Sequence, residues 1–187
     1  MNIANKLTLL RVILVFVFMG VIWMPMVSFE TSLWLALCIF IVASLTDFLD
    51  GYLARKLNLV TNLGKFMDPL ADKMLVTAAM IAIVDKGYLL PAGILPAWIV
   101  VFILLREFIV SGIRLVAAAE NKIIAANYLG KVKTVIQMLM IIIYLIPIEF
   151  PFIKGLAITL AYLALLLTLI SGLEYMWQNK HIIKTNE

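Results

Sequence analysis

Charged residues are scarce in this sequence, and that scarcity limits the classes of protein it can be. Only 14% of its 187 residues are Asp, Glu, Lys or Arg, whereas soluble globular domains contain about 25%. Hydrophobic residues make up 65%, and the mean hydropathy is +1.10. This composition excludes an ordinary soluble globule and provides several apolar stretches of the roughly 20 residues that a membrane-spanning helix needs.

Cysteine and histidine are also nearly absent. Cys38 lies alone in an apolar run, which excludes a disulfide framework within the chain and favours a packing role in a helix. His181 lies in a polar tail, where we expect it to be solvated. The net charge is +4, but no basic run with interleaved aromatic residues is present, so we expect no nucleic-acid partner. Attraction to an anionic membrane surface explains the charge more simply.

Six apolar segments are separated by short polar or proline-containing connections. We expect an all-α integral membrane protein with six transmembrane helices, forming one domain over residues 1–187. A polar lead-in, residues 2–8, is expected to lie at the membrane interface. The first 20 residues contain no Ala-x-Ala cleavage site, which predicts a retained membrane segment. The predicted spans are 7–26, 32–55, 64–84, 97–118, 128–146 and 153–177.

The distribution of basic residues predicts the orientation. Six spans put both termini on one side of the membrane, and of the 15 lysines and arginines only Lys86 and Lys154 fall on the other side. Because positively charged residues are enriched on the cytoplasmic side, both termini are expected to be cytoplasmic. We therefore predict a multi-pass protein of a bacterial-type inner membrane.

Four acidic residues lie close together in this apolar sequence: Asp47, Asp50, Asp68 and Asp72. Asp47 and Asp50 are three residues apart, and Asp68 and Asp72 are four apart, so each pair would share one helix face. Two carboxylate pairs facing each other suit hard divalent cations such as Mg²⁺ or Mn²⁺. Ionisable residues within membrane segments are functional candidates by default, and these four acids lie at the predicted cytoplasmic ends of their spans. The sequence thus predicts an active site at the cytoplasmic side.

Small and basic residues accompany the acids at fixed spacings. Gly51 and Ala54 leave room for a bulky ligand, and Arg55 offers a planar donor fork suited to phosphate. Two bound metals would bind a diphosphate and orient an in-line displacement at phosphorus. Asp72, one turn beyond Asp68, would take the proton of an attacking hydroxyl as general base.

Written as a pattern, the stretch is D-x2-D-G-x2-A-R-x8-G-x3-D-x3-D, and every fixed position is filled. It resembles the signature of the CDP-alcohol phosphotransferase family of integral-membrane phospholipid-synthesis enzymes. The resemblance implies a CDP-linked lipid as donor, CMP as leaving group, a homodimer, and two Mg²⁺ or Mn²⁺ ions per site. It implies metal ligation by Asp47, Asp50 and Asp68, with Asp72 as base and a further ligand. It also implies CDP-lipid contacts from Gly51, Ala54, Arg55, Asn5 and Thr8.

A second polar cluster predicts the acceptor. Arg106 and Arg114 fall within about a quarter turn of each other on an ideal helix, and Lys131 and Lys133 open the fifth span. Cations buried near the cytoplasmic side need an anion, and a phosphate on the acceptor would supply it. Lys131 and Lys133 lie about 200° apart on a helix, so one of them faces lipid headgroups if the helix starts regularly.

Three segments resemble the phosphatidylglycerophosphate synthase branch of the family: Asn5-Lys-Leu-Thr8-x-x-Arg11, Arg106-Glu-Phe-Ile-Val-Ser-Gly-Ile-Arg114 and Gly130-Lys-Val-Lys-Thr134. Ala4 stands where that pattern usually has proline. This resemblance implies sn-glycerol 3-phosphate as acceptor, whose primary hydroxyl would attack the lipid-side phosphorus of CDP-diacylglycerol. The product would be phosphatidylglycerol phosphate. The last span is similar only in being apolar.

Three other functions fit parts of the sequence. Within the family, the acceptor could instead be inositol phosphate, serine or phosphatidylglycerol, although serine would need the basic cluster less. Membrane prenyltransferases also bind a diphosphate through two Asp-rich motifs, but those motifs lie far apart and lack the Gly-x-x-Ala-Arg insert. A divalent-cation transporter would explain neither Arg55 nor the separate basic cluster.

Overall fold

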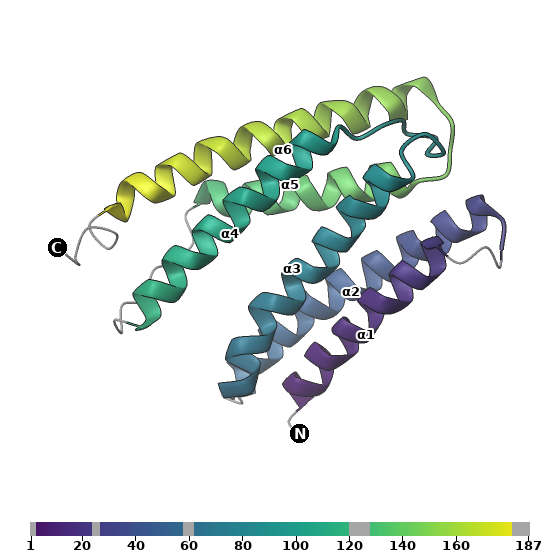
Figure 1. The fold of residues 1–187 in the computed structure, drawn as a ribbon. Helices are drawn as coiled ribbons and strands as arrows, with labels where there is room; N and C mark the ends of the chain where they lie inside the picture. Colours follow the sequence, from purple (N-terminus) through teal and green to yellow (C-terminus); the bar gives the residue numbers. More distant parts are fainter. Residues whose placement is uncertain (1–2, 24–26, 58–61, 120–127, 181–187) are drawn as a thin grey trace.

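The computed structural model describes the backbone of residues 3–23, 27–57, 62–119 and 128–180 and the side chains of residues 9–23, 27–46, 73–118 and 128–180. This part of the chain contains six α-helices and no strand, which confirms the all-α prediction (Figure 1). Each predicted span corresponds to one helix. The predicted polar lead-in, residues 2–8, is helical from Ile3 onward and forms the start of the first helix. The helices are α1 (Ile3–Trp23), α2 (Phe29–Leu57), α3 (Asn62–Asp85), α4 (Ala97–Ala119), α5 (Tyr128–Leu145) and α6 (Pro151–Gln178).

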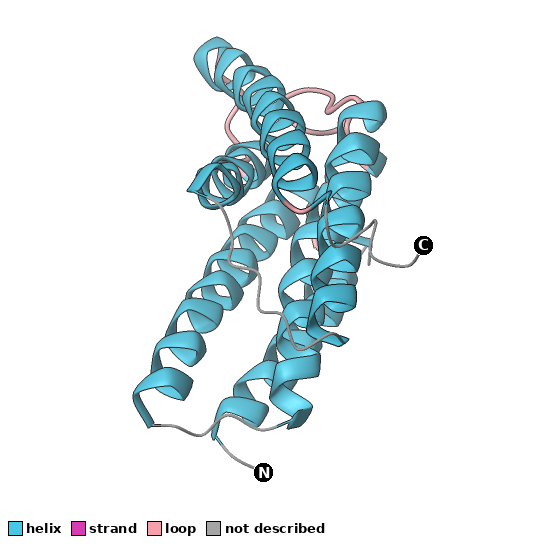
Figure 2. Ribbon diagram, turned by 90° about the vertical axis from the view of Figure 1, so that its left-hand side faces the viewer, coloured by secondary structure: helices cyan, strands magenta, loops and turns pink. Residues whose placement is uncertain are grey.

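The helices form two groups that meet where α5 contacts α2 and α3 and where α3 contacts α4. In the first, α1 packs against both α2 and α3; in the second, α6 packs against both α5 and α4. The α3–α4 and α5–α6 connections lie at one end of the molecule (Figure 2). The C-terminal end of α2, the N-terminal end of α3 and the start of α1 lie at the opposite end (Figure 1). The segments that carry the four acidic residues thus lie at the same end of the molecule.

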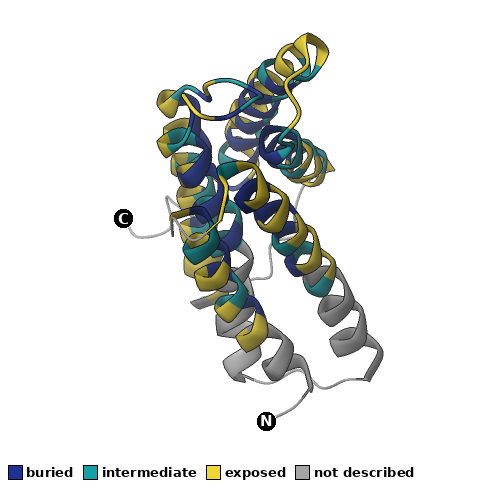
Figure 3. Cartoon of the chain, turned by 90° about the vertical axis from the view of Figure 1, so that its right-hand side faces the viewer, coloured by how far each residue is buried: buried dark blue, intermediate teal, exposed yellow. Residues whose placement is uncertain are grey.

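One hydrophobic core joins all six helices, and buried residues face inward between them (Figure 3). Its largest fully buried side chains include Phe18 of α1 and Phe40 of α2. On α6 most of the buried positions are small, with Ala157, Ala161 and Ala164 on one face. Small residues at this spacing let helix backbones approach closely, which explains how α6 packs against two neighbours.

The outer surface is strongly apolar. Large hydrophobic side chains such as Phe16, Leu115 and Phe152 are each more than 60% exposed. A soluble monomer rarely exposes apolar surface so extensively. Within the described residues, three segments are long and apolar enough to cross a membrane, namely Phe29–Thr46 of α2, all of α5 and all of α6; Leu9–Trp23 of α1 is a shorter apolar stretch.

A polar contact ties α1 to α3 at the end of the molecule remote from the acidic residues. The indole Nε1 of Trp23 donates to a carboxylate oxygen of Asp85 at 3.0 Å. Lys86 Nζ lies 3.2 Å from the same carboxylate and 5.8 Å from the centre of the Trp23 ring. Trp side chains at such helix ends combine an apolar body with a polar edge, which suits a membrane interface.

Candidate active site

The described part of the site is a polar cluster centred on Glu107, where α3, α4 and α5 meet. Lys133 of α5 donates to Glu107 Oε1, and the Lys133 side chain is only 1% exposed. Arg106 Nη1 lies 3.3 Å from the same oxygen. Lys73 Nζ, from α3, lies 3.8 Å from Oε2. One carboxylate thus faces three cations, so the cluster carries two more formal positive charges than negative ones.

Lys73 links α3 to α4 through a second set of contacts. Its amino group donates to Ser111 Oγ and to the backbone carbonyl of Glu107, the latter at 3.4 Å. Ser111 in turn donates to that carbonyl at 2.6 Å, one turn back along α4. Because Lys73 directly follows Asp72 in the sequence, these contacts fix α4 next to the part of α3 that carries the second acidic pair.

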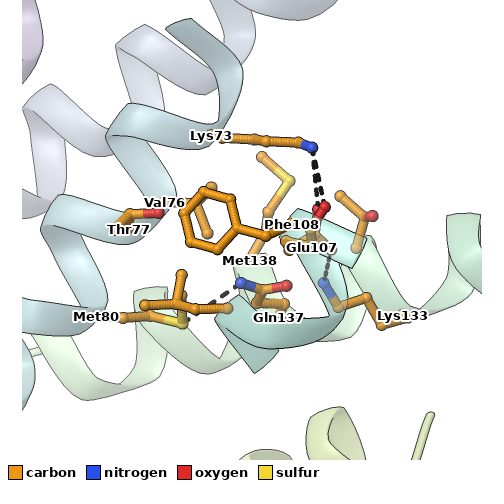
Figure 4. A pocket seen from close by; sticks show the side chains of 11 residues that line it. Lys73, Val76, Thr77, Met80, Glu107, Phe108, Lys133, Gln137 and Met138 are labelled. Atoms are coloured by element: carbon orange, nitrogen blue, oxygen red, sulfur yellow. Dashed lines mark hydrogen bonds and ion pairs between the residues drawn. The ribbon is translucent and has the colours of Figure 1, made fainter. Parts of the chain in front are cut away.

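A pocket lies beside this cluster, between α3, α4 and α5 (Figure 4). In Figure 4 the amino groups of Lys73 and Lys133 approach Glu107 from different sides. Gln137 Nε2 is 3.4 Å from Met80 Sδ at another wall. The pocket is therefore cationic where it meets Glu107 and mostly apolar elsewhere. Its lining consists of Lys73, Val76, Thr77, Met80, Leu104, Glu107, Phe108, Lys133, Thr134, Gln137 and Met138.

Arg106 also contacts α6. Its Nη2 donates to Ser171 Oγ at 3.1 Å, and its side chain is 12% exposed. The guanidinium is held between a carboxylate on its own helix and a hydroxyl on another, so its orientation is fixed from two sides. Nothing in the sequence indicated that α6 belongs to the site, because the pattern of that span is simply apolar.

The four residues predicted to bind the acceptor phosphate are not all equivalent in the structure. Arg106 and Lys133 meet at Glu107, as described above. Arg114 instead donates from Nε to the Tyr175 hydroxyl of α6 at 3.3 Å, and its guanidinium carbon lies 5.6 Å from the centre of that ring. Lys131 is exposed, whereas Lys133 is buried. The 200° spacing had indicated this difference between the two lysines.

Glu107 and Lys73 were not predicted as site residues. Glu107 is an ionisable residue in the middle of an apolar helix, and that alone is a signal for a buried partner. Neither residue could be assigned without the packing of α3, α4 and α5, because Lys73 and Lys133 lie 34 and 26 positions from Glu107 in the sequence.

The predicted metal ligands lie on two of the helices already described. Asp47 and Asp50 fall in α2, and Asp68 and Asp72 fall in α3. Their side chains lie outside the described residues. So do those of the predicted CDP-lipid contacts Asn5, Thr8, Gly51, Ala54 and Arg55. Among the side chains that are described, no three His, Cys, Asp or Glu residues gather at one point.

The donor chemistry of the acidic segments suits divalent metals. Their carboxylates are hard oxygen donors, the type that Mg²⁺ and Mn²⁺ prefer. The backbone brings the end of α2 and the start of α3 to the same end of the molecule (Figure 1). The arrangement of the helices is therefore compatible with ligands contributed by both pairs.

Similarity to known proteins extends over nearly the whole chain. The profile of the CDP-alcohol phosphatidyltransferase family matches residues 1–170, so Ser171 and the residues after it lie beyond the match. A CDP-diacylglycerol–glycerol-3-phosphate 3-phosphatidyltransferase of Bacillus subtilis is 42% identical, over 99% of this chain and 98% of its own length. Proteins of the same name from Haemophilus influenzae and Shigella flexneri are 38% and 36% identical. Each alignment covers 94% of this chain, and 91% and 93% of the respective relative.

Proposed function

This chain belongs to the CDP-alcohol phosphatidyltransferase family, and we propose that it transfers the phosphatidyl group of CDP-diacylglycerol to sn-glycerol 3-phosphate. The products are phosphatidylglycerol phosphate and CMP. The proposal is supported by the names of relatives that align over almost the full chain. It is also supported by one observation of the structure, the excess of positive charge at the Glu107 cluster.

That excess favours a phosphorylated acceptor. Glu107 balances one of the three cations that surround it, and a phosphate dianion would balance the other two. Charge-assisted hydrogen bonds from Arg and Lys to phosphate are among the stronger interactions available in a protein. An uncharged or zwitterionic acceptor such as serine would leave the buried positive charge uncompensated, at a substantial cost. Arg106 and Lys133 are therefore assigned to the acceptor phosphate, with Lys73 beside them and Arg114 and Lys131 further along the same helices.

The donor is assigned to the ends of α2 and α3. The family uses divalent metals, and two Mg²⁺ or Mn²⁺ ions held by Asp47, Asp50, Asp68 and Asp72 would supply Lewis-acid stabilisation of the diphosphate. Gly51 and Ala54 leave room for the cytidine nucleotide, and Arg55 donates to its phosphates. Asn5 and Thr8 of α1 contribute further contacts to the CDP-lipid.

Asp72 is assigned as the general base. It removes the proton from the primary hydroxyl of glycerol 3-phosphate, and that oxygen then attacks the lipid-side phosphorus. Its neighbour Lys73 contacts Glu107 and Ser111, which holds the base-bearing helix against the helix that binds the acceptor. These contacts keep the residues that bind the acceptor and the residue that activates it at fixed relative positions.

The whole chain acts as one membrane domain in this assignment. Six helices cross a bacterial-type inner membrane, both termini are cytoplasmic, and the site opens to the cytoplasmic side. Water-soluble glycerol 3-phosphate and an embedded lipid can meet there. The basic residues of the chain support this orientation. A homodimer is the proposed assembly.

An acceptor-competition assay tests the function. Membranes that contain the protein, supplied with Mg²⁺ or Mn²⁺ and CDP-diacylglycerol, should form labelled lipid and CMP from labelled glycerol 3-phosphate. Labelled serine, inositol phosphate and phosphatidylglycerol serve as competing acceptors. Preferential incorporation of any of these three would replace the acceptor assignment, and membranes without the protein provide the background.

A further inference from the structure

The Arg106 side chain is held by α6 as well as by its own helix. Its Nη1 lies 3.3 Å from Glu107 Oε1, while Nη2 donates to Ser171 Oγ at 3.1 Å. Ser171 is fully buried and donates its own proton to the backbone carbonyl of Thr168 at 3.3 Å. Because that bond uses the only hydroxyl proton of Ser171, its oxygen can interact with a further group only as an acceptor. The hydroxyl is therefore committed to accept from Arg106.

Gly172 provides the space through which the Arg106 side chain passes. A Cβ atom at this position would lie 2.8 Å from Arg106 Cγ, 3.8 Å from Nε and 3.9 Å from Cβ. Carbon atoms do not approach to 2.8 Å without one of them moving, so any larger residue would displace the arginine stem. Glycine weakens a helix relative to alanine, and at residue 172, inside α6, there is a packing reason for it. The close approach of Arg106 is that reason.

The other described glycine of α6 offers a contrast. A Cβ atom at Gly155 would meet nothing within 4 Å. Gly172 instead continues the buried face of small residues that includes Ala161, Ala164 and Thr168. The small-residue face brings α6 close to its neighbours, and at Gly172 a charged side chain from α4 fills the space.

We propose that Ser171 and Gly172 of α6 are positioning residues for the acceptor site, which set the orientation of the Arg106 guanidinium relative to Glu107 and Lys133. Gly172 fixes the path of the side chain, and Ser171 fixes the rotation of its planar end. The inference rests on the proposed function, because Arg106 is assigned there to the acceptor phosphate. It extends the site to the sixth helix, beyond the residues that the family profile matches.

Substitution of Gly172 by Ala tests the path of the side chain. We expect G172A to raise the KM for glycerol 3-phosphate about tenfold, the effect of weakening one charge-assisted phosphate contact, while the KM for CDP-diacylglycerol stays unchanged. Gly155→Ala, in the same helix, is the matched control and should leave both constants unchanged. If G172A behaves like G155A, or raises both KM values equally, the proposal is overturned.

A double-mutant cycle separates positioning from general helix packing. In an Arg106→Ala background the Cγ and Nε atoms that the new methyl group would meet are gone. Gly172→Ala should then have no further effect on the KM for glycerol 3-phosphate. An undiminished effect in that background would mean that the glycine serves helix packing only, and would overturn the proposal.

Substitutions of Ser171 provide a test that does not depend on the Gly172 variant folding. Ser171→Ala should raise the KM for glycerol 3-phosphate with little change in kcat, and Ser171→Thr, which keeps the hydroxyl, should restore most of the affinity. Equal values for the Ala variant and wild type would overturn the role of Ser171. If the wild-type protein itself transfers nothing to glycerol 3-phosphate, the proposed function fails. If the wild type is active and the α6 variants have no selective effect, only the present inference fails.

Discussion

Lys133 on α5 donates to the carboxylate of Glu107 on α4, and the lysine is almost completely buried in that contact. A buried charge without a partner is costly, whereas a paired one is tolerated. The pair therefore joins the two helices while Arg106 and Lys73 approach the same carboxylate. A single acidic side chain thus organises cations from three helices.

Removal of the Glu107 charge should destabilise the fold. Breaking a fully buried ion pair costs about 3 to 5 kcal/mol, and because Glu107 is 22% exposed we expect Glu107→Gln to cost about 2 kcal/mol. For a chain of this length that lowers the Tm by about 4 to 8 °C. Thermal unfolding in detergent measures it. Saturating glycerol 3-phosphate should recover part of the loss, because its phosphate supplies an anion to the same cations.

The matched control for this substitution is Glu149→Gln. Glu149 pairs with Lys154 at 2.8 Å, but its side chain is 76% exposed, and surface ion pairs contribute little to stability. The Tm of the control should equal that of the wild type. Equal Tm values for both variants would contradict a structural role for the Glu107 cluster.

The two lysines at the start of α5 should differ in importance. Lys133 is buried against Glu107 and lines the pocket, whereas Lys131 is exposed. Lys133→Ala should raise the KM for glycerol 3-phosphate by about tenfold or more, since it removes a charged donor from the acceptor site. Lys131→Ala should change it little. A larger effect from Lys131 would move the acceptor phosphate to the other face of the helix.

Arg114 is expected to contribute less to acceptor binding than Lys133. It contacts Tyr175 rather than Glu107. We expect Arg114→Ala to raise the KM for glycerol 3-phosphate more than that for CDP-diacylglycerol, but by less than Lys133→Ala does. Tyr175→Phe removes the hydroxyl that Arg114 contacts and retains the aromatic ring, so its effect should be smaller still. A selective rise in the KM for CDP-diacylglycerol would remove Arg114 from the acceptor side.

Substitution of Asp72 separates catalysis from donor binding. If Asp72 is the general base, Asp72→Asn should lower kcat by about a hundredfold or more while binding of CDP-diacylglycerol is retained. Binding is measured with labelled CDP-lipid in the absence of acceptor. Loss of that binding would make Asp72 chiefly a metal ligand.

Metal removal tests the donor site as a whole. Chelation with EDTA should abolish formation of CMP and of labelled lipid, and Mg²⁺ or Mn²⁺ should restore both, because hard oxygen ligands prefer these ions. Activity that survives exhaustive chelation would contradict the assignment of the four acids as metal ligands. The Tm of the chelated protein distinguishes loss of metal from loss of fold.

The helices were largely predictable from the sequence. Apolar runs of about 20 residues, interrupted by polar or proline-containing turns, predicted six segments, and each corresponds to one helix. Ends were less predictable: α2 begins at Phe29, three residues before the predicted position, and α6 begins at Pro151, two before it. Such ends depend on local capping and turns more than on hydropathy.

The site was predictable only in part, and the acceptor side shows why. Helical spacing indicated that Lys131 and Lys133 face different ways, since the angle between two positions on one helix follows from its geometry. The partners of Arg106 could not be inferred in this way. Glu107 is adjacent in sequence, but Ser171 is 65 positions away and appeared only as part of an apolar span.

The sequence alone determined the class of protein, the number of helices in the described residues and the motif that predicts the donor chemistry, because these depend on composition and on short, regular spacings. The tertiary structure decided which cations converge. It brought Lys73, Arg106 and Lys133 to one carboxylate, and it placed Ser171 and Gly172 against Arg106. Contacts between helices depend on how small and large side chains interlock across the bundle. That packing is not encoded in the periodicity of any single helix.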